Sequence, residues 1–294
     1  MKICLACKIR FEAHVFFCPV CGHSPEARDG YPAFAPDLAT GHDGFKAGFF
    51  ATLAELETGN FWFESRNRLL IWALGRYYPK AEIFLEIGCG TGFVLSGIRR
   101  EFQDIKLFGS DIFSEGFAYA KERVLDATFF QMNAQEIPFE DEFDVIGAFD
   151  VLEHIKDDEA VLKQMHQACK HNGGIILTVP QHAFLWSCMD EYSCHVRRYH
   201  AHDLKAKVKR AGFKVLRTTS FVSILLPLLI ISRLKMQKPD PKFDPTFEFR
   251  NNSIVNTIFE RILDLERSMI RLGFPFPVGG SLLLIARKVS GFNS

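Results

Sequence analysis

The stretch that decides the fold is FLEIGCGTGFVLSGI, Phe84 to Ile98, in which an apolar run meets three glycines at alternate positions and then resumes. The apolar residues before the glycines predict a buried strand, and those after them predict a helix. The glycines are Gly88, Gly90 and Gly92. Because a glycine has no Cβ atom, the chain can turn sharply there and a ligand can approach the main chain. The stretch therefore predicts a strand, a ligand-binding loop and a helix.

The residues around the loop narrow the kind of ligand. Position 93 is Phe93, so the G-x-G-x-x-G fingerprint of dinucleotide sites is incomplete, and no Gly-Lys-Ser/Thr follows as a Walker A loop would need. What remains is E-x-G-x-G-x-G, with Glu86 ahead of the first glycine. Asp111 ends the next predicted strand, where a carboxylate can accept hydrogen bonds from both hydroxyls of a ribose. An acid at a strand end is usually only solvated, but together with the glycine loop it favours a nucleoside.

Short apolar strands alternate with helical segments after Pro79, which is typical of an α/β chain with a parallel sheet. Two further strands are predicted at Phe213–Phe221 and Ser281–Val289, separated by a long insertion. Ahead of the sheet, helical periodicity covers Phe49–Leu56 and Phe61–Tyr78. Asn60 is placed to cap the second of these helices, and both should lie over the ligand edge of the sheet.

From about Ile83 to Gly212, with the last strand added, the chain resembles the class I S-adenosylmethionine-dependent methyltransferases. The resemblance implies an α/β fold with a Rossmann-like, mostly parallel sheet of seven strands whose last strand is antiparallel. It also implies S-adenosylmethionine as the cofactor, with the methionine moiety at the glycine loop and the ribose at Asp111. The adenine would lie beside Asn133, where several members of the family have Asp. The residues implied in cofactor binding are Glu86, Gly88, Cys89, Gly90, Gly92, Asp111, Ile112, Asn133, Ala134 and Asp150.

Two CxxC pairs lie in the first 21 residues, as Cys4-Leu-Ala-Cys7 and Cys18-Pro-Val-Cys21. Each pair presents two thiolates to one tetrahedral ion, so the spacing predicts a zinc ribbon with a structural zinc ion. The ten residues between the pairs could form a short hairpin. The alternative is four structural or free thiols. The segment resembles the short zinc ribbons found at the ends of many bacterial and archaeal proteins, which serve as folding staples as often as binding modules.

These patterns divide the chain into five parts. A Pro-, Gly- and Asp-rich stretch after the ribbon is typical of a linker. The helical insertion falls before the last strand. The predicted parts are a zinc ribbon (1–24), a linker with N-terminal helices (25–80), the methyltransferase core (81–221), an apolar and helical insertion (222–280), and the last core strand with the C-terminus (281–294).

A candidate catalytic group follows the fourth predicted strand, where Asp150 is followed by Glu153 and His154. A general base here would suffice to deprotonate a hydroxyl acceptor. The stretch also resembles ubiquinone-biosynthesis O-methyltransferases, in which an acid-x-x-Glu-His run binds a divalent metal. The alternative is that His154 only packs and Glu153 caps a helix that starts near Asp157. The candidate catalytic residues are His154, Asp150, Glu153 and, further along the chain, His195.

A polar and aromatic stretch after the fifth strand contains His195-Val-Arg-Arg-Tyr-His200. It resembles a His-x-Arg-Arg-Tyr stretch of bacterial methyltransferases of lipid and cell-surface glycan pathways. The resemblance implies an acceptor pocket, with arginines suited to a phosphate or carboxylate. The alternative is a capped helix start with solvated arginines. The residues implied in the pocket are His195, Arg197, Arg198, Tyr199 and His200.

The insertion begins with FVSILLPLLIISRLK, from Phe221 to Lys235, which is too short an apolar run to span a bilayer. Residues 221–238 could rest in a membrane interface, roof an apolar acceptor pocket, or form a buried helix. A clearer amphipathic helix follows in VNTIFERILDLERSMIRLGFPFP, and Gly273 is placed to end it.

The bulk composition limits the function classes. Lys and Arg number 35, as do Asp and Glu, so no global field favours a nucleic-acid partner. The N-terminus lacks a signal-peptide core, which predicts a cytoplasmic protein, with peripheral contact at the inner membrane face as an option. The sequence thus predicts a methyltransferase acting on oxygen of a small, lipid-linked or glycan-like acceptor. The alternatives are a non-catalytic nucleoside-binding module with a partner-recruiting ribbon, and a nucleic-acid methyltransferase.

Overall fold

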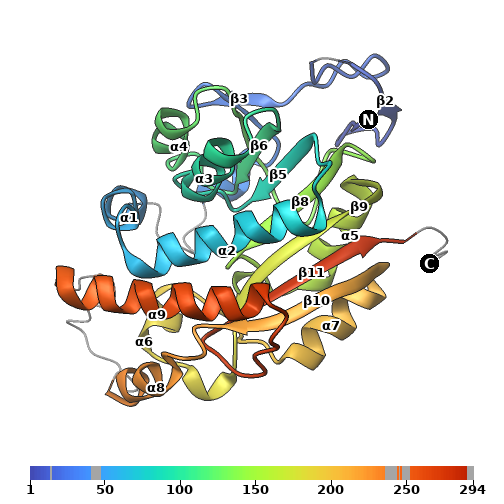
Figure 1. The fold of residues 1–294 in the computed structure, drawn as a ribbon. Helices are drawn as coiled ribbons and strands as arrows, with labels where there is room; N and C mark the ends of the chain where they lie inside the picture. The colour runs from blue at the N-terminus through green and yellow to red at the C-terminus, as the bar shows by residue number, and fades with distance from the viewer. Residues whose placement is uncertain (14, 41–47, 236–243, 245, 247–251, 290–294) are drawn as a thin grey trace.

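In the computed structural model, a single large sheet organises the chain, with helices on both of its faces (Figure 1). The structure describes residues 1–13, 15–40, 48–235, 244, 246 and 252–289. Within these residues the sheet has nine strands, which are β3 (Glu26–Arg28), β4 (Tyr31–Ala33), β5 (Ile83–Ile87), β6 (Lys106–Asp111), β7 (Thr128–Gln131), β8 (Phe143–Phe149), β9 (Cys169–Pro180), β10 (Phe213–Phe221) and β11 (Ser281–Lys288).

The predicted seven-stranded core is confirmed. Its spatial order is β10-β11-β9-β8-β5-β6-β7. The strands from β5 to β9 pair in parallel, whereas β11 runs antiparallel to both β9 and β10. The strand before the glycines, β5, therefore lies at the centre, between β6 and β8. Parallel strands end at the same edge of a sheet, so the loops after β5, β6 and β8 meet there.

The predicted linker is wrong for residues 26–33, because they form a hairpin that extends the sheet beyond β7. Asp29 and Gly30 both have positive φ, at 51° and 84°, as the type I′ turn of a two-residue hairpin requires. Strand β4 pairs with β7 at Ala33 and Gln131. The Gln131 side chain holds the next segment, since its Oε1 accepts from Ala35 N at 2.9 Å and its Nε2 donates to Ala35 O at 2.7 Å.

The helices divide between the two faces of the sheet. Helices α2, α3, α4 and α9 share a core with one face, and α5 and α7 share a core with the other. Asn60 caps α2 as predicted, because its side chain accepts from Trp62 N at 3.0 Å. The helices are α1 (Phe49–Glu57), α2 (Phe61–Tyr77), α3 (Phe93–Glu101), α4 (Phe117–Arg123), α5 (Asp158–Ala168), α6 (Cys188–Tyr192), α7 (Ala201–Arg210), α8 (Leu226–Lys235) and α9 (Ser253–Arg271).

The buried carboxylate of Asp158 joins α5 to α7 and to the segment before α7. It accepts from Tyr199 Oη at 2.6 Å and from Lys207 Nζ at 2.6 Å, and it pairs with Arg197 Nη1 at 2.8 Å. Burial raises the pKa of Asp158, but the hydrogen bonds from Lys207 and Tyr199 and the positive charges outweigh it, so the pKa lies below its usual range. Asp158 therefore stabilises this half of the fold as an anion.

Replacing Asp158 with Asn should lower the free energy of unfolding at pH 7 by roughly 2–4 kcal/mol, because Lys207 and Arg197 lose their counter-charge. Since the pKa of Asp158 is depressed, the difference between wild type and variant should shrink as the pH falls through the carboxyl range. Urea unfolding at several pH values measures both effects. The exposed Asp203→Asn is the matched control and should change stability by less than about 0.5 kcal/mol. Equal loss in the two variants would contradict the assignment.

Candidate functional site

A cavity of about 1290 Å³ opens at the carboxyl ends of β5, β6 and β8. The loops after these strands form its floor, and α1, α2 and α8 contribute walls. Glu57 of α1 ties that helix to the glycine loop, because its carboxylate accepts from Thr91 Oγ1 and from Arg123 Nη1, both at 2.5 Å. The chain thus encloses the predicted ligand loop with helices from its N-terminal part and from its insertion.

The glycine loop has the backbone that its sequence predicts. Gly88, Gly90 and Gly92 all have positive φ, at 71°, 49° and 72°. A Cβ atom on Gly88 would lie 2.4 Å from Val151 Cγ2, and one on Gly92 would lie 2.8 Å from Ala120 Cα, so these two glycines are needed for packing. Gly90 lines the cavity, as Gly88 does, whereas Gly92 is not among the lining residues. The predicted role of Gly92 in direct ligand contact therefore has no support in the geometry.

The other predicted cofactor residues line the cavity, and two of them are acids in unusual surroundings. Burial raises the pKa of Glu86 well above its usual range, and its Oε2 has no hydrogen-bond partner in the described part of the chain. Burial also raises the pKa of Asp111 to about 6, although Phe113 N and Gly90 N donate to its carboxylate, at 3.1 and 3.0 Å. Once ionised, Glu86 could pair with the ammonium group of a ligand, and Asp111 could accept from ribose hydroxyls. The remaining lining residues of the predicted set are Gly88, Cys89, Gly90, Ile112, Asn133, Ala134 and Asp150.

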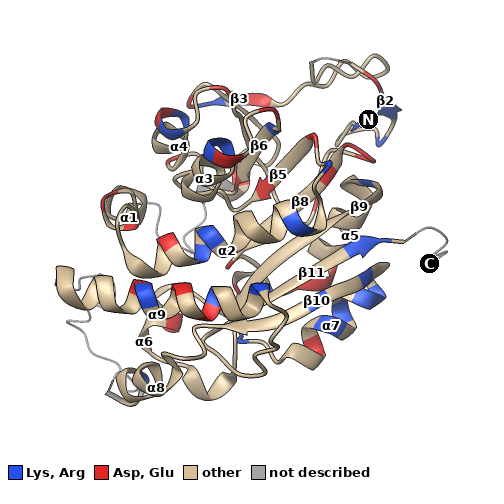
Figure 2. Cartoon of the chain, in the orientation of Figure 1, with Lys and Arg blue, Asp and Glu red and all other residues tan. Residues whose placement is uncertain are grey.

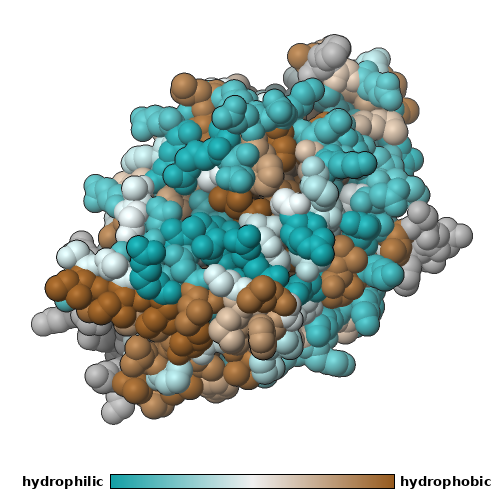
Figure 3. Space-filling model, in the orientation of Figure 1, coloured by the Kyte–Doolittle hydropathy of each residue, from teal (hydrophilic) through white to brown (hydrophobic). Residues whose placement is uncertain are grey.

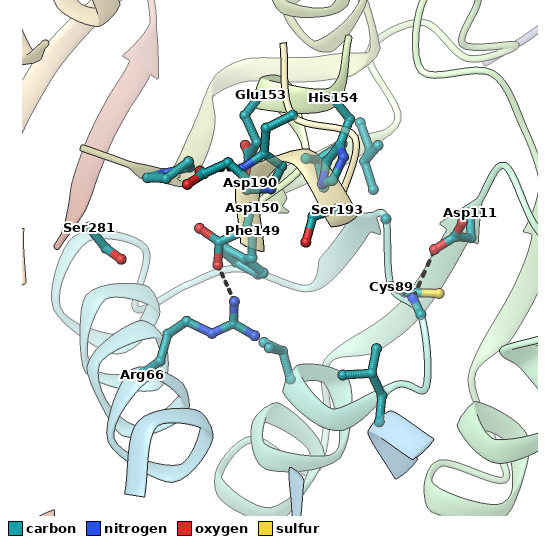
Figure 4. A pocket seen from close by; sticks show the side chains of 18 of the residues that line it. Arg66, Cys89, Asp111, Phe149, Asp150, Glu153, His154, Asp190, Ser193 and Ser281 are labelled. Carbon is teal, nitrogen blue, oxygen red and sulfur yellow. Dashed lines mark hydrogen bonds and ion pairs between the residues drawn. The ribbon is translucent and has the colours of Figure 1, made fainter. Parts of the chain in front are cut away.

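Asp150 carries an ion pair that the sequence did not reveal. Arg66 of α2 reaches across the cavity and pairs with the Asp150 carboxylate (Figure 4). The guanidinium carbon of Arg66 lies 4.3 Å from the centroid of the Trp62 ring, which adds a cation–π contact. Asp150 has a φ of 59°, and Val222, also a lining residue, has a φ of 60°. Both positions lie in the left-handed region that side chains other than glycine rarely adopt.

Glu153, His154 and His195 form a compact cluster on another wall of the cavity. The two imidazole rings meet edge to face with centroids 4.7 Å apart, and His195 Nε2 lies 4.0 Å from Glu153 Oε1. Burial lowers the pKa of His154 to about 4, and burial raises the pKa of Glu153 well above its usual range. Glu153 is not a helix cap, because Asp157 caps α5 by accepting from Ala160 N at 3.0 Å. The alternative in which Glu153 caps that helix is therefore wrong.

Asp190 of α6 orients this cluster, and only the capping-box spacing of Ser187 and Asp190 marks it in the sequence. Its Oδ1 lies 2.9 Å from His195 Nδ1, and both of its oxygens accept from the Arg198 guanidinium, at 2.7 and 2.9 Å. These contacts lower the pKa of Asp190 to about 2, against the effect of burial, which raises it. Because Nδ1 of His195 faces a carboxylate, Nε2 is left toward Glu153 and the cavity.

The predicted acceptor pocket residues are only partly brought together. His195 and Arg198 line the cavity, and Arg198 is buried rather than solvated. Arg197 and Tyr199 instead bind Asp158, away from the cavity. His200 is exposed and stands at the N-terminus of α7. The pocket prediction is therefore wrong for Arg197, Tyr199 and His200.

A divalent metal could be held by a set of residues that differs from the predicted one. The ligand atoms of Glu153, His154 and His195 all lie within 4.8 Å of one another. Both Glu153 oxygens and His154 Nδ1 lack a hydrogen-bond partner among the residues that the structure describes, so the group can accept an ion. Asp150 does not belong to this group because it is paired with Arg66. Of the predicted metal set Asp150, Glu153 and His154, the structure groups Glu153 and His154 with His195 and leaves Asp150 out.

The four cysteines of the two CxxC pairs converge at the N-terminus. Their sulfur atoms all lie within 4.8 Å of one another, and the Cys4–Cys21 and Cys7–Cys18 Sγ pairs are 3.6 Å apart. Four thiolates at about 2.3 Å from a tetrahedral zinc ion would be about 3.8 Å from one another. The cluster therefore suggests a zinc site.

The ribbon differs from its predicted form and packs on the main sheet. Strand β1 (Lys2–Ile3) pairs with β2 (Arg10–Phe11), so the hairpin encloses the first CxxC pair instead of lying between the two pairs. Ile3 N donates to Pro138 O at 3.0 Å, and the Phe16 ring packs on Phe34 and Phe139. The ribbon thus lies against the segment between β7 and β8.

The family comparison agrees with this fold. A family model described as "Methyltransferase domain" matches residues 57–218, more than half of the chain. No curated protein sequence matches the chain.

Solved structures show the same fold at low identity. A complex between the Haloferax volcanii Trm112 methyltransferase activator and a methyltransferase matches with a TM-score of 0.54 at 16% identity, over 84% of this chain and 96% of that one. Haemonchus contortus phosphoethanolamine N-methyltransferase 2 with S-adenosyl-L-methionine matches with a TM-score of 0.51 at 21% identity, over 76% and 52%. The [4+2]-cyclase SpnF matches with a TM-score of 0.53 at 17% identity, over 78% and 83%.

Purified protein should contain one zinc ion per chain, bound by Cys4, Cys7, Cys18 and Cys21, since their sulfurs have the spacing that zinc requires. Elemental analysis measures it. The Cys18→Ser/Cys21→Ser double variant should lose the metal, whereas Cys194→Ser, outside the cluster, should keep it. Zinc at the wild-type level in the double variant would refute the site.

Proposed function

The chain belongs to the methyltransferase domain family, and its family and fold make it a class I S-adenosylmethionine-dependent methyltransferase. We propose that it methylates an oxygen atom of a small acceptor that is lipid-linked or glycan-like. The observation that carries the proposal is that one cavity joins a glycine loop and Asp111 to a second wall of paired histidines and carboxyls. Bound S-adenosylmethionine supplies an electrophilic methyl group. The residues of the chain bind the donor and prepare the acceptor.

The donor would bind along the β5 and β6 loops. Asp111 would accept hydrogen bonds from the ribose hydroxyls, and the backbone at Gly88 and Gly90 would lie against the methionine moiety. Asn133 and Ala134 are proposed to contact the adenine, and Glu86 to receive the ammonium group. The Arg66–Asp150 ion pair lines the same cavity as the glycine loop and the histidine cluster, and we propose that Asp150 positions the donor instead of removing a proton.

Of the two histidines, His195 is the better candidate for the general base. The Asp190 carboxylate stands at Nδ1, so a proton taken up at Nε2 would give an imidazolium beside an anion. His154 carries no such partner, and burial lowers its pKa to about 4, which makes it a weak base at neutral pH. We propose that His154 and Glu153 shape the pocket for the acceptor hydroxyl next to His195.

A divalent ion held by Glu153, His154 and His195 is the second candidate mechanism, favoured by their unpartnered ligand atoms. Such an ion would act as a Lewis acid on the acceptor oxygen. A weak chelator that spares thiolate-bound zinc distinguishes the two mechanisms. Activity that survives this treatment supports the base, and activity that is lost and then restored by magnesium supports the metal.

The acceptor is proposed from the chemistry of the remaining walls. Leu225, Leu228, Leu229 and the Phe259 ring make one side of the cavity apolar. Two buried guanidinium groups also lie there: Arg198, which pairs with Asp190, and Arg233, which donates to Ser187 Oγ at 2.8 Å. An apolar chain linked to a phosphate or carboxylate would satisfy both. We also propose a cytoplasmic location, because a reducing compartment keeps the zinc thiolates available. The nucleic-acid alternative is disfavoured by the balanced net charge.

The acceptor class can be tested with donor carrying a ¹³C-labelled methyl group. Total lipid extract and polar extract are each incubated with the protein, and NMR of the products separates methyl on oxygen from methyl on nitrogen. Transfer to oxygen in the lipid extract supports the proposal. Transfer only to nitrogen, or only to an added nucleic acid, would overturn it, and donor binding without transfer to any pool would support the non-catalytic alternative.

Donor affinity should depend on pH through Asp111. Because its pKa is about 6 in the free protein and the ribose prefers the carboxylate, the donor Kd should rise as the pH falls below 6, by up to about tenfold per pH unit. Asp111→Asn should abolish this dependence and weaken binding at pH 8 by about 1–3 kcal/mol. Calorimetry measures both, with exposed Asp126→Asn as the control. A Kd for wild type that is flat from pH 5 to 8 would contradict the role of Asp111.

Once an acceptor is known, His195→Ala should lower kcat by ~10²- to 10⁴-fold with nearly unchanged donor affinity, because proton removal matters in the transition state. His154→Ala should cost less if His195 is the base. The exposed His200→Ala is the matched control and should retain full activity. Full activity of the His195 variant, with or without metal, would exclude both mechanisms.

A further inference from the structure

We propose that α8, α9 and the segment after α9 form a surface that docks onto an anionic lipid bilayer. This surface, called here the α8–α9 surface, is larger than the predicted contact through residues 221–238, of which 236–238 lie outside the described residues. Its apolar members are Leu228, Ile231 and Leu234 of α8, Ile254, Ile258 and Leu265 of α9, and Leu272, Phe274 and Val278 after α9.

The exposed apolar side chains gather on one face of the molecule. Ile254 is 72% exposed, Leu265 59% and Leu272 80%. The spacing from Ile254 through Ile258 and Leu265 to Leu272 follows one stripe of the helix. Figure 3 shows them as a brown band that runs along α9 and continues over α8. Single exposed apolar residues are common on protein surfaces, but a contiguous apolar surface of this kind indicates an interaction site.

The charges of α9 are sorted between its two sides. Glu260 and Asp264 turn inward and pair with Arg68 of α2, at 2.7 and 3.3 Å. Glu266 is fully buried and accepts from Ser223 N and Ile224 N, both at 2.8 Å. The exposed charged residues of the helix are cations, Arg261 and Arg271. In Figure 2 the first turns of α9 carry neither charge, whereas α7 bears both.

This combination fits a lipid surface better than a second copy of the chain. Arg261 and Arg271 make no ion pair with any residue that the structure describes. In a two-fold dimer the same surface would face itself, so these cations would meet like charges and no acid of α9. An anionic bilayer supplies negative headgroups for the arginines and an apolar boundary for the leucines and isoleucines. No described helix has the length and apolar composition to cross the bilayer, so the contact would be peripheral.

The surface is continuous with the cavity. Leu228 is exposed on α8 and also lines the cavity, together with Leu229 and Ser232 of α8 and Phe259 of α9. A lipid-linked acceptor could therefore pass from the bilayer into the cavity along one apolar wall. This last step rests on the proposed function, whereas the docking itself does not.

Flotation of the purified full chain with lipid vesicles tests the docking. Phosphatidylcholine vesicles are compared with vesicles that also contain phosphatidylglycerol, and wild type should float mainly with the second kind. Ile258→Gln/Leu265→Gln should reduce the bound fraction by roughly tenfold or more, because two exposed apolar anchors are lost. The matched control is Val15→Gln/Leu125→Gln, at two exposed apolar positions away from the surface, which should float as wild type does.

Arg261→Glu/Arg271→Glu provides a second, independent variant and should remove the preference for anionic vesicles. Sedimentation of the vesicle-free protein reports self-association, and donor calorimetry shows that each variant keeps its folded core. Failure of wild type to float overturns the proposal, as does a dimer that the Ile258/Leu265 variant breaks without any change in flotation. Docking with no methyl transfer to lipid would leave the surface intact and count only against the proposed acceptor.

Discussion

The wall of the cavity that is proposed to bind the acceptor depends on the buried carboxylate of Asp190. It receives the Arg198 guanidinium and stands against His195, and it also accepts from Ser187 N at 2.9 Å, which begins α6. Three parts of the loop after β9 are therefore fixed to two oxygen atoms. Without this anion, the buried Arg198 would lose its partner and His195 would lose the group that orients it. The same carboxylate therefore stabilises the local fold and sets the orientation of His195.

The two halves of the site are built in different ways. In the half proposed for the donor, backbone hydrogen bonds fix the loop, because Gly88 N and Cys89 N donate to Ser110 O and Gly90 N donates to the Asp111 carboxylate. The acceptor half uses side chains from α2, from the turn after β8 and from α6, which meet only in the folded chain. Solved structures that share this fold include a methyltransferase and a [4+2]-cyclase, so the fold alone does not determine the reaction.

Features that depend on interactions between residues close together in the sequence could be predicted, and most of those that depend on distant residues could not. The glycine loop, the Asn60 cap and the CxxC pairs act within a few residues, so their patterns predict their structure. Arg66 lies 84 positions from Asp150, and no local pattern marks such a partner. Asp190 lies within eight positions of His195 and Arg198, but only the capping-box spacing from Ser187 marks it, and that spacing does not reveal which other side chains it binds. The hairpin at 26–33 was missed for another reason: Asp29-Gly30 is a turn signal, but the short strands around it lack the alternation that predicts a sheet.

Two residues that line the cavity have backbones that stability alone would not select. Asp150 and Val222 have the positive φ values that suit glycine, and each position costs about 1–2 kcal/mol for an ordinary side chain. At position 150, however, the strained residue supplies the carboxylate that pairs with Arg66, and glycine has no side chain to do so. A redesign that inserts glycine there would relieve the backbone strain but leave the largely buried Arg66 guanidinium without its partner. Efforts to engineer this protein should therefore keep Asp150 and Val222, although their backbones are strained.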